Sequence, residues 1–407
     1  MDEKTDVVVV GGGYAGVMAA NRLTQREDVA VTLVNPRERF VERIRLHQLV
    51  GGSHPAVVDY DAVLAEGVRL VVDTATRIDA GRRQVHLGRG DVLGYDHLVY
   101  AVGSGSAALR VPGAAEHAYP LASHEEAERL RLALAADPAG PVTVVGAGPS
   151  GIETAAELAE AGRSSGRART VTLVSGGVVG PYLHPHGRAF VARRLAALGV
   201  TVLDGPGSTV TRVRHDAVEL ADGREVPSGV TIWTAGFGVP GLARRSGLST
   251  DAVGRLLTDE TLTSVDDDRI VAAGDSAAPS GLAFRMSCQA AGPLGAQAAD
   301  TVLHRLAGES PTPVRIGFLG QCLSLGRGDG MFQLAHRDDS ARRTALHGRA
   351  GARLKELVCR STVQQLVWEA RRPGTSFVPR WVADPTRPAQ LAALHAETVP
   401  GRATTST

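Results

Sequence analysis

Two stretches of the chain repeat the same pattern of apolar and glycine positions. Residues 7–10 are four consecutive valines, followed by a glycine-rich turn and then by residues 17–23, whose composition is compatible with a helix. Residues 142–145 are again apolar, residues 146–151 are again glycine-rich, and helix-forming residues follow at 155–158. A short apolar run bounded by glycine predicts a buried strand of a parallel sheet. Each stretch therefore predicts a strand, a tight turn and a helix, in that order.

The glycines of both turns have the spacing of a dinucleotide-binding fingerprint. The first turn carries Gly11, Gly13 and Gly16, and the second carries Gly146, Gly148 and Gly151. In such a turn the first glycine allows the tight bend, the second lets the backbone approach a pyrophosphate, and the third lets helix and strand pack closely. Free amides at the helix start then hold the phosphates. A glycine-rich turn of an unrelated α/β protein is the alternative, and the flanking strand and helix argue against it.

Other landmarks recur at the same distance along the chain. Gly11 and Gly146 are 135 positions apart, as are the pairs Arg77-Ile78 and Arg212-Val213, and Gly103 and Gly236 are 133 apart. Between the turns, residues 70–72, 76–78, 84–87 and 97–100 resemble the short strands of a β-meander. The spacing predicts a duplicated α/β chain with two dinucleotide-binding domains.

Polar and small residues follow several predicted strands, where ligands of α/β sheets bind. The strand at 29–34 ends at Asn35 instead of the usual acidic residue, although an amide can still bond a ribose hydroxyl. The strand at 97–100 continues into the small residues 101–104, and an apolar strand at 269–273 leads into Gly274 and Asp275. For Asp275 a helix cap is the alternative. Residues 37–47 mix charged and apolar positions, and both a solvated segment and a role near the cofactor are open.

Composition limits the class of protein. A chain of 407 residues predicts two or three domains. A net charge of +1 gives no reason to expect a nucleic-acid partner. The first residues run directly into a strand and no apolar run approaches the ~20 residues that cross a bilayer, so we expect a cytoplasmic protein. The three cysteines, Cys288, Cys322 and Cys359, form neither a disulfide framework nor a metal pattern.

This ordered set of motifs resembles the FAD-dependent pyridine nucleotide oxidoreductases with two dinucleotide-binding domains, and is most similar to the type II NADH:quinone oxidoreductases. The resemblance covers about residues 6–300. It implies FAD in the first unit, NADH or NADPH in the second, and Glu153 near the nicotinamide. It also implies an FAD domain of residues 1–115 and 240–312, an NAD(P)H domain of residues 116–239, and a C-terminal α+β region of residues 313–407 with helical segments and a mobile tail.

The resemblance supplies the expected site residues. The cofactor-binding set is Gly11, Gly13, Tyr14, Ala15, Gly16, Asn35, Ala101, Gly103, Ser104, Gly146, Gly148, Gly151, Gly236, Gly274 and Asp275. Glu153, Cys288 and Gln289 are expected near the reacting flavin.

The chain departs from the family pattern at three places. The quinone pattern Ala-Gln-x-Ala-x-Gln falls on residues 288–293, where Gln289 and Ala291 match but Cys288 and Pro293 do not. The strand at 171–174 ends at Ser175 without the acidic residue that favours NADH, so the choice of nicotinamide cofactor is open. No two cysteines are close in sequence, which favours direct electron transfer from flavin to acceptor.

In the C-terminal region, residues 352–368 carry two apolar trios whose helical faces are about half a turn apart. A single membrane-facing stripe therefore requires a helix break near Ser361-Thr362, and packing on the protein's own core or on a second subunit is favoured. Peripheral contact with the inner face of the membrane and a homodimer are left open.

The leading hypothesis is an FAD-dependent NAD(P)H dehydrogenase that reduces a quinone or quinone-like acceptor. One alternative is a soluble reductase for a dedicated redox partner or a biosynthetic intermediate, which Pro293 favours. The other is a non-enzymatic flavin-based redox sensor, against which the intact second fingerprint argues.

Overall fold

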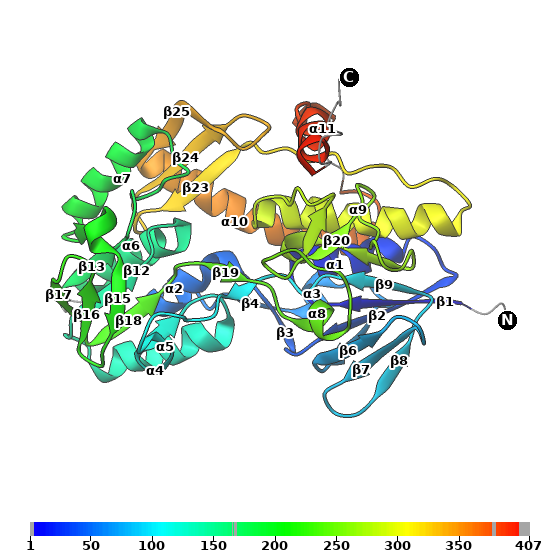
Figure 1. Ribbon diagram of the computed structural model, residues 1–407, viewed down its shortest axis with the longest axis horizontal. Helices are drawn as coiled ribbons and strands as arrows, with labels where there is room; N and C mark the ends of the chain where they lie inside the picture. Colours follow the sequence, from blue (N-terminus) through cyan, green and yellow to red (C-terminus); the bar gives the residue numbers. More distant parts are fainter. Residues whose placement is uncertain (1–3, 165, 167–168, 377–379, 399–407) are drawn as a thin grey trace, which may run out of the picture.

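A five-stranded parallel sheet forms the first unit of the protein. The structure is a computed structural model that describes residues 4–164, 166, 169–376 and 380–398. The sheet has the order β21-β9-β1-β2-β5. Its strands are β1 (Thr5–Val10), β2 (Val29–Asn35), β5 (Arg69–Val72), β9 (His97–Tyr100) and β21 (Ile270–Ala272). The edge strand β21 comes from far along the chain, so this sheet is assembled from two distant segments (Figure 1).

The second unit repeats this arrangement. Its sheet has the order β11-β18-β12-β13-β14, again all parallel. The strands are β11 (Ala118–Pro120), β12 (Val142–Val145), β13 (Val171–Val174), β14 (Thr201–Leu203) and β18 (Val230–Trp233). The order β18-β12-β13-β14 matches β9-β1-β2-β5, and only the fifth strand differs in origin. The predicted α/β fold with two Rossmann-like units is confirmed.

Each unit also carries a separate antiparallel meander. The first consists of β6 (Ala75–Asp79), β7 (Gln84–Leu87) and β8 (Val92–Gly94), and the second of β15 (Val210–Val213), β16 (Ala217–Leu220) and β17 (Glu225–Pro227). The prediction that all strands between residues 70 and 100 form one meander is wrong. β5 and β9 instead join the parallel sheet, β9 as a buried inner strand and β5 as a partly exposed edge strand beside β2.

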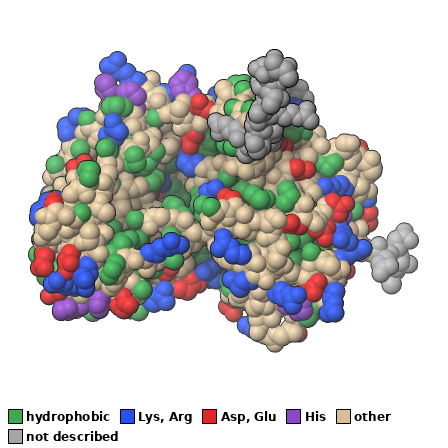
Figure 2. All heavy atoms as spheres, viewed as in Figure 1, with side chains coloured by type: hydrophobic (Ala, Val, Ile, Leu, Met, Phe, Trp, Pro, Cys, Tyr) green, Lys and Arg blue, Asp and Glu red, His purple; other side chains and the backbone are tan. Residues whose placement is uncertain are grey.

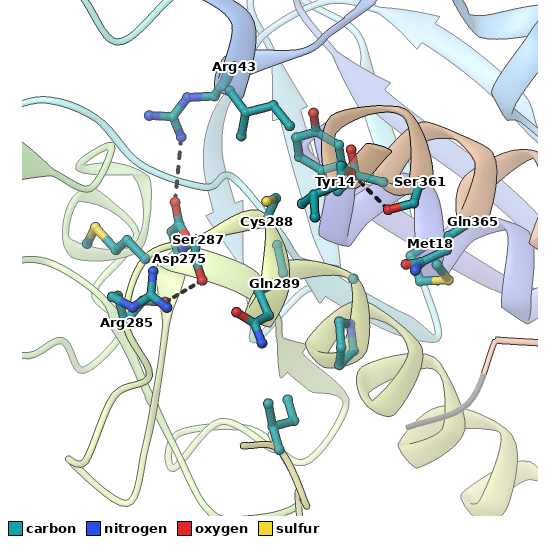
Figure 3. Close-up of a pocket in the computed structure, with 18 of the residues that line it drawn as sticks. Tyr14, Met18, Arg43, Asp275, Arg285, Ser287, Cys288, Gln289, Ser361 and Gln365 are labelled. Atoms are coloured by element: carbon teal, nitrogen blue, oxygen red, sulfur yellow. Dashed lines mark hydrogen bonds and ion pairs between the residues drawn. The ribbon is translucent and has the colours of Figure 1, made fainter. Parts of the chain in front are cut away.

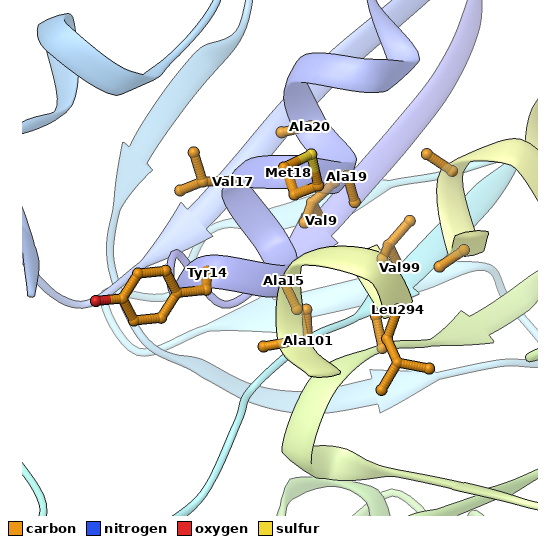
Figure 4. Close-up of a cluster of buried hydrophobic side chains, with 14 of the residues drawn as sticks. Val9, Tyr14, Ala15, Val17, Met18, Ala19, Ala20, Val99, Ala101 and Leu294 are labelled. Carbon is orange, nitrogen blue, oxygen red and sulfur yellow. The ribbon is translucent and has the colours of Figure 1, made fainter. Parts of the chain in front are cut away.

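Helices cover the first sheet tightly. α1 (Tyr14–Leu23) lies between the sheet and α9 (Cys288–Leu306), and its small residues form a core with Val9, Val99 and Leu294 (Figure 4). A Cβ at Gly295 would lie 2.2 Å from the carbonyl oxygen of Ala15, so the two helices touch through their backbones. This contact holds the start of α9 beside the first glycine turn.

The two units are joined by connections that pair with each other. β10 (Gly105–Ser106) leads out of the first unit and β19 (Phe237–Gly238) leads back, and the two are antiparallel. The second unit contains α5 (His124–Ala136), which starts with the predicted capping box of Ser123 and Glu126, and also α6 (Pro149–Ser164) and α7 (Pro185–Ala197). Shorter elements are β3 (Arg39–Val41), β4 (Val57–Asp59), α2 (Leu46–Gly51), α3 (Tyr60–Val63), α4 (Ala114–His117), α8 (Leu242–Arg245), β20 (Leu256–Thr258) and β22 (Ala277–Pro279).

The C-terminal region is an antiparallel sheet with one long helix. β23 (Gly320–Ser324), β24 (Gly330–Ala335) and β25 (Ala341–His347) lead into α10 (Gly348–Arg371), and α11 (Arg387–Thr398) follows. α10 is unbroken at Ser361-Thr362. It packs on α1 and on β24, which agrees with the expectation that this segment packs on the protein's own core. The last residues of the expected mobile tail, 399–407, lie outside the described residues. Among the described helices, none has the length and hydropathy to cross a membrane.

Candidate active site

One large cavity, about 1520 Å³ in volume, connects the two glycine-turn units and the C-terminal region. Figure 2 shows the molecule hollowed between its two lobes. The walls come from α1, the start of α6, α9, β23 and α10. Of the residues expected in the site, the cavity is lined by Tyr14, Ser104, Glu153, Asp275, Cys288 and Gln289.

The first glycine turn fits a dinucleotide pyrophosphate. Gly11 has a φ of +110°, and a Cβ at Gly16 would lie 1.7 Å from the Gly11 carbonyl oxygen, so only glycine fits at either position. At Gly13 a Cβ would meet no atom within 4 Å, which leaves the amides at the start of α1 open to a ligand. Ala15 lies beneath Gly274, whose Cβ would approach the Ala15 methyl group to 2.9 Å. The residues present therefore fit FAD at this turn.

The second turn has the same construction. Gly146 has a φ of +107°, and a Cβ at Gly151 would lie 1.8 Å from the Gly146 carbonyl oxygen. Open space surrounds Gly148, as it does Gly13. Gly236 at the end of the neighbouring strand also has a positive φ, +83°. These features fit a second dinucleotide, and the binding roles of the individual residues stay predictions.

Asn35 helps to shape the first turn. Its Oδ1 accepts a hydrogen bond from the Gly12 amide at 3.1 Å, and its Nδ2 donates to the Arg37 carbonyl oxygen at 2.9 Å. The Tyr60 hydroxyl donates to the Gly12 carbonyl oxygen at 2.7 Å. Both polar atoms of the Asn35 side chain therefore bond to the main chain. A contact between Asn35 and a ribose stays a prediction.

A second group of polar residues meets where the first sheet ends. Asp275 accepts hydrogen bonds from the Ser104 hydroxyl at 2.6 Å and from the Ser287 amide at 3.1 Å. Arg43 donates to Ser104 at 2.9 Å and lies 3.5 Å from the Asp275 carboxylate (Figure 3). Because Ser287 caps α9, Asp275 also fixes the start of that helix. Ala101 and Gly103 lie on the same strand end, and the Gly103 amide donates to Ser276.

The segment at residues 37–47 is not a solvated loop. It forms β3, a short 3-10 turn and the start of α2, and it buries Phe40, Arg45 and His47. Arg43 of this segment reaches the cavity, although sequence reasoning did not select it. The mixture of charged and apolar residues at positions 37–47 is the feature of the sequence that points to a role for Arg43. It does not predict the contact with Asp275, which lies 232 positions away.

Glu153 lies in a buried ionic cluster. Its carboxylate is 2.9 Å from Lys355 Nζ on α10, accepts a hydrogen bond from the Ser324 amide at 2.8 Å, and lies 3.6 Å from His47 Nδ1. Burial disfavours the charged form of both groups, but the attraction between the two charges is stronger than this effect. The pKa of Lys355 is therefore raised well above its usual value, and the pKa of Glu153 is lowered. Burial lowers the pKa of His47 to about 4, so this imidazole is neutral at pH 7. The cluster joins all three regions of the chain at the cavity wall.

The start of α9 carries Cys288 and Gln289, which follow Ser287 beside the Asp275 group (Figure 3). The Gln289 side chain accepts a hydrogen bond from the Leu319 amide at 2.8 Å and donates to the Gly320 carbonyl oxygen at 3.1 Å, so it ties α9 to β23. Distance in sequence does not keep the cysteines apart: Cys288 and Cys322 both line the cavity. Burial raises the pKa of the Cys288 thiol to about 12, which keeps it protonated at pH 7. Electron transfer without a thiol relay stays a prediction.

Comparisons with known proteins identify the family. Residues 5–299 match the pyridine nucleotide-disulphide oxidoreductases. A NADH dehydrogenase-like protein of Mycobacterium tuberculosis is 31% identical over 79% of this chain and 86% of its own length. A type II NADH:quinone oxidoreductase of Haemophilus influenzae is 27% identical over 67% of this chain and 73% of its own.

The fold also agrees with a solved structure. NDH2 of Plasmodium falciparum, determined in complex with NADH, superimposes with a TM-score of 0.76 at 15% identity, covering 93% of this chain and all of the other. The duplicated sheets, the two glycine turns and the matched residues lead to one conclusion. The chain belongs to the pyridine nucleotide-disulphide oxidoreductase family and is an oxidoreductase enzyme.

Proposed function

We propose that the chain is an FAD-dependent NAD(P)H dehydrogenase that reduces a quinone. The overall reaction is NAD(P)H + H⁺ + quinone → NAD(P)⁺ + quinol. The observation that carries this proposal is the continuous cavity, which runs from Ser150 and Glu153 of the second unit, past Asp275 and Cys288, to the space between α9 and α10. Such a cavity supports the proposal, because a donor site and an acceptor site could share one path.

The chain's own residues supply binding and charge. A Cβ at Gly13 or Gly148 would meet no atom within 4 Å, and this open space suits the approach of the two pyrophosphates. Asp275 and Arg43 lie 3.5 Å apart between the two turns. A bound FAD would supply the hydride-accepting and electron-transferring chemistry that these residues lack. Lys355, held charged by Glu153, would put a positive charge on the cavity wall that stabilises negative charge developing on a quinone oxygen.

The wall between α9 and α10 suits an apolar ring. Met18, Ala296, Leu354 and Val358 line it. Of the relatives, that of M. tuberculosis is named as NADH dehydrogenase-like and that of H. influenzae as a type II NADH:quinone oxidoreductase. Pro293 also lines the cavity, at a position where the family pattern has a glutamine. Proline in place of glutamine removes a polar group from the acceptor side of the cavity. This favours a second candidate function, a reductase for a dedicated acceptor other than a membrane quinone.

We also propose a peripheral contact with an anionic membrane surface. One exposed stripe of α10 carries Leu357, 62% exposed, and Trp368, 57% exposed, flanked by Arg353, Arg360 and Arg371. Trp368 and Arg371 also line the cavity, so the stripe lies beside an opening through which a lipid-soluble acceptor would enter.

The test is anaerobic reduction followed by an acceptor panel. The purified flavoprotein is mixed with NADH or NADPH, bleaching at about 450 nm is followed, and turnover is then measured with several soluble quinones and with ferricyanide. The proposal expects rapid bleaching and quinone turnover. Rapid bleaching and ferricyanide turnover without acceleration by any quinone would select the second candidate. The absence of bleaching with either nucleotide would contradict both and support the sensor hypothesis.

A further inference from the structure

Tyr14 occupies a position of the first glycine turn that usually serves only through its backbone. It is the first residue of α1, and its amide belongs to the group that faces the pyrophosphate space. The side chain extends away from the turn, where its ring meets Phe40 edge-on at 5.0 Å between centroids. Phe40 is fully buried and contacts Tyr60 in the same manner, at 6.5 Å. This aromatic stack fixes the direction of the phenol.

The Tyr14 hydroxyl is buried but has no hydrogen-bond partner among the described residues. The residue is 9% exposed and lines the cavity. Burial raises the pKa of the phenol well above its usual value, so the group is a neutral donor at pH 7. An unpaired buried hydroxyl is costly. A ligand that accepts a hydrogen bond here would remove that cost.

The surrounding wall tells which kind of ligand fits. Figure 3 shows Tyr14 lying near Cys288 and Ser361 among the residues that line the cavity. The hydroxyl groups of α10 on this side are engaged within their own helix, since Ser361 donates to the Val358 carbonyl oxygen at 2.9 Å and Thr362 to that of Cys359 at 2.7 Å. Both α10 hydroxyls donate their protons within the helix, so neither donates to Tyr14, and the Thr362 oxygen is the acceptor on this wall that a ligand would have to replace.

The cavity wall around Tyr14 suits a ligand with an apolar body and one hydrogen-bond acceptor. A quinone has that chemistry, because its ring is flat and apolar and its carbonyl oxygens accept hydrogen bonds but do not donate them. We infer that the Tyr14 phenol donates a hydrogen bond to a carbonyl oxygen of the quinone and so holds it beside the start of α9. This inference rests on the proposed quinone reduction. Tyr14 would thereby bind the acceptor through its side chain while its amide serves the cofactor.

The experiment uses Tyr14→Phe, which removes only the hydroxyl and keeps the edge-on contact with Phe40. Tyr95→Phe is the matched control, because the Tyr95 hydroxyl is equally buried and unpartnered but does not line the cavity. Binding of a soluble 1,4-naphthoquinone to the oxidised flavoprotein is measured by calorimetry without NAD(P)H. Turnover with that quinone and with ferricyanide, and bleaching by NAD(P)H, are measured on the same samples.

For Tyr14→Phe the dissociation constant of the quinone should rise about three- to tenfold, as expected for one neutral hydrogen bond. The kcat/KM for the quinone should fall at least as much, because the bond strengthens when charge develops on the oxygen. Bleaching, ferricyanide turnover and flavin content should stay unchanged, and Tyr95→Phe should match the wild type throughout.

Two results would overturn the inference while the proposed function stands. One is a Tyr14→Phe protein with unchanged quinone binding and turnover. The other is a loss of flavin or a shifted flavin spectrum, which would make the hydroxyl a cofactor ligand instead. A wild-type protein that bleaches and reduces ferricyanide but neither binds nor reduces any quinone would overturn the proposed function, and the inference with it.

Discussion

Removing Lys355 should destabilise the protein through the carboxylate that it leaves behind. The side chains of Lys355 and Glu153 are 10% and 8% exposed, and their charged atoms are 2.9 Å apart. In Lys355→Met the Glu153 carboxylate keeps one amide donor, that of Ser324, and loses the ammonium that paired with it, while burial still opposes a charge on His47. Breaking a buried pair in this way costs about 3–5 kcal/mol, a large part of the roughly 5–15 kcal/mol that holds a domain folded.

The variant should also reverse the pH dependence of stability. In the wild type the pKa of Glu153 is below the value of 4.5 for an unperturbed carboxyl, so its contribution is present above pH 4.5 and is lost as the pH falls. Without Lys355, burial acts on Glu153 with less opposition and raises its pKa above that of the unfolded chain. The contribution is then present below pH 4.5 and is lost as the pH rises toward neutrality.

The assay is urea denaturation of the flavoprotein between pH 4 and 8, with flavin release and far-ultraviolet circular dichroism as probes. Glu153→Gln in the Lys355→Met background should restore most of the loss, because no buried charge is then unpaired. Arg360→Met is the control on the same helix, since its pair with Glu356 is 75% and 36% exposed and should contribute under about 0.5 kcal/mol. The reasoning is refuted if Lys355→Met costs no more than the Arg360 control, or if the double variant loses the sum of the two single losses.

Three further changes test the turns and the surface. Gly13→Ala meets open space and should leave the flavin-free protein as stable as the wild type, yet weaken FAD binding about tenfold; Gly16→Ala clashes with a carbonyl oxygen and should lower its melting temperature. Ser175→Asp, at the end of β13, should raise the ratio of kcat/KM for NADH to that for NADPH by at least about tenfold, because a carboxylate repels a 2′-phosphate. Leu357→Ser should reduce co-sedimentation with anionic vesicles by roughly tenfold in partition coefficient and leave turnover with a soluble quinone unchanged, because Leu357 is exposed and does not line the cavity.

The parts of the fold that depend on local sequence could be predicted. Both glycine turns follow from steric limits at single residues, such as Gly16, whose Cβ would overlap a carbonyl oxygen one turn earlier. The duplication followed from spacing, and the repeated strand order bears it out. The assignment of β5 and β9 failed because a short apolar strand has the same composition in a meander and in a parallel sheet.

The interior of the site could not be predicted, because tertiary packing brings its residues together. Glu153 and Lys355 are 202 positions apart, and neither residue's neighbours in sequence announce the other. Arg43 and His47 were indistinguishable from surface residues until Phe40 and α2 were seen to be buried. The orphaned hydroxyl of Tyr14 is likewise a property of the assembled wall, since it depends on which hydroxyl groups of α10 are already engaged.

The fifth strand of the first sheet, β21, comes from late in the chain, and this affects the order in which the two units can fold during synthesis. The sheet of the second unit uses residues 118–233 alone, whereas the sheet of the first unit is complete only when β21, at residues 270–272, has left the ribosome. Since domains fold as units while the chain emerges, the inserted unit can close while the N-terminal unit still exposes the edge of β9. Nascent chains stopped before residue 270 should therefore protect the second fingerprint from proteases and leave the first one accessible.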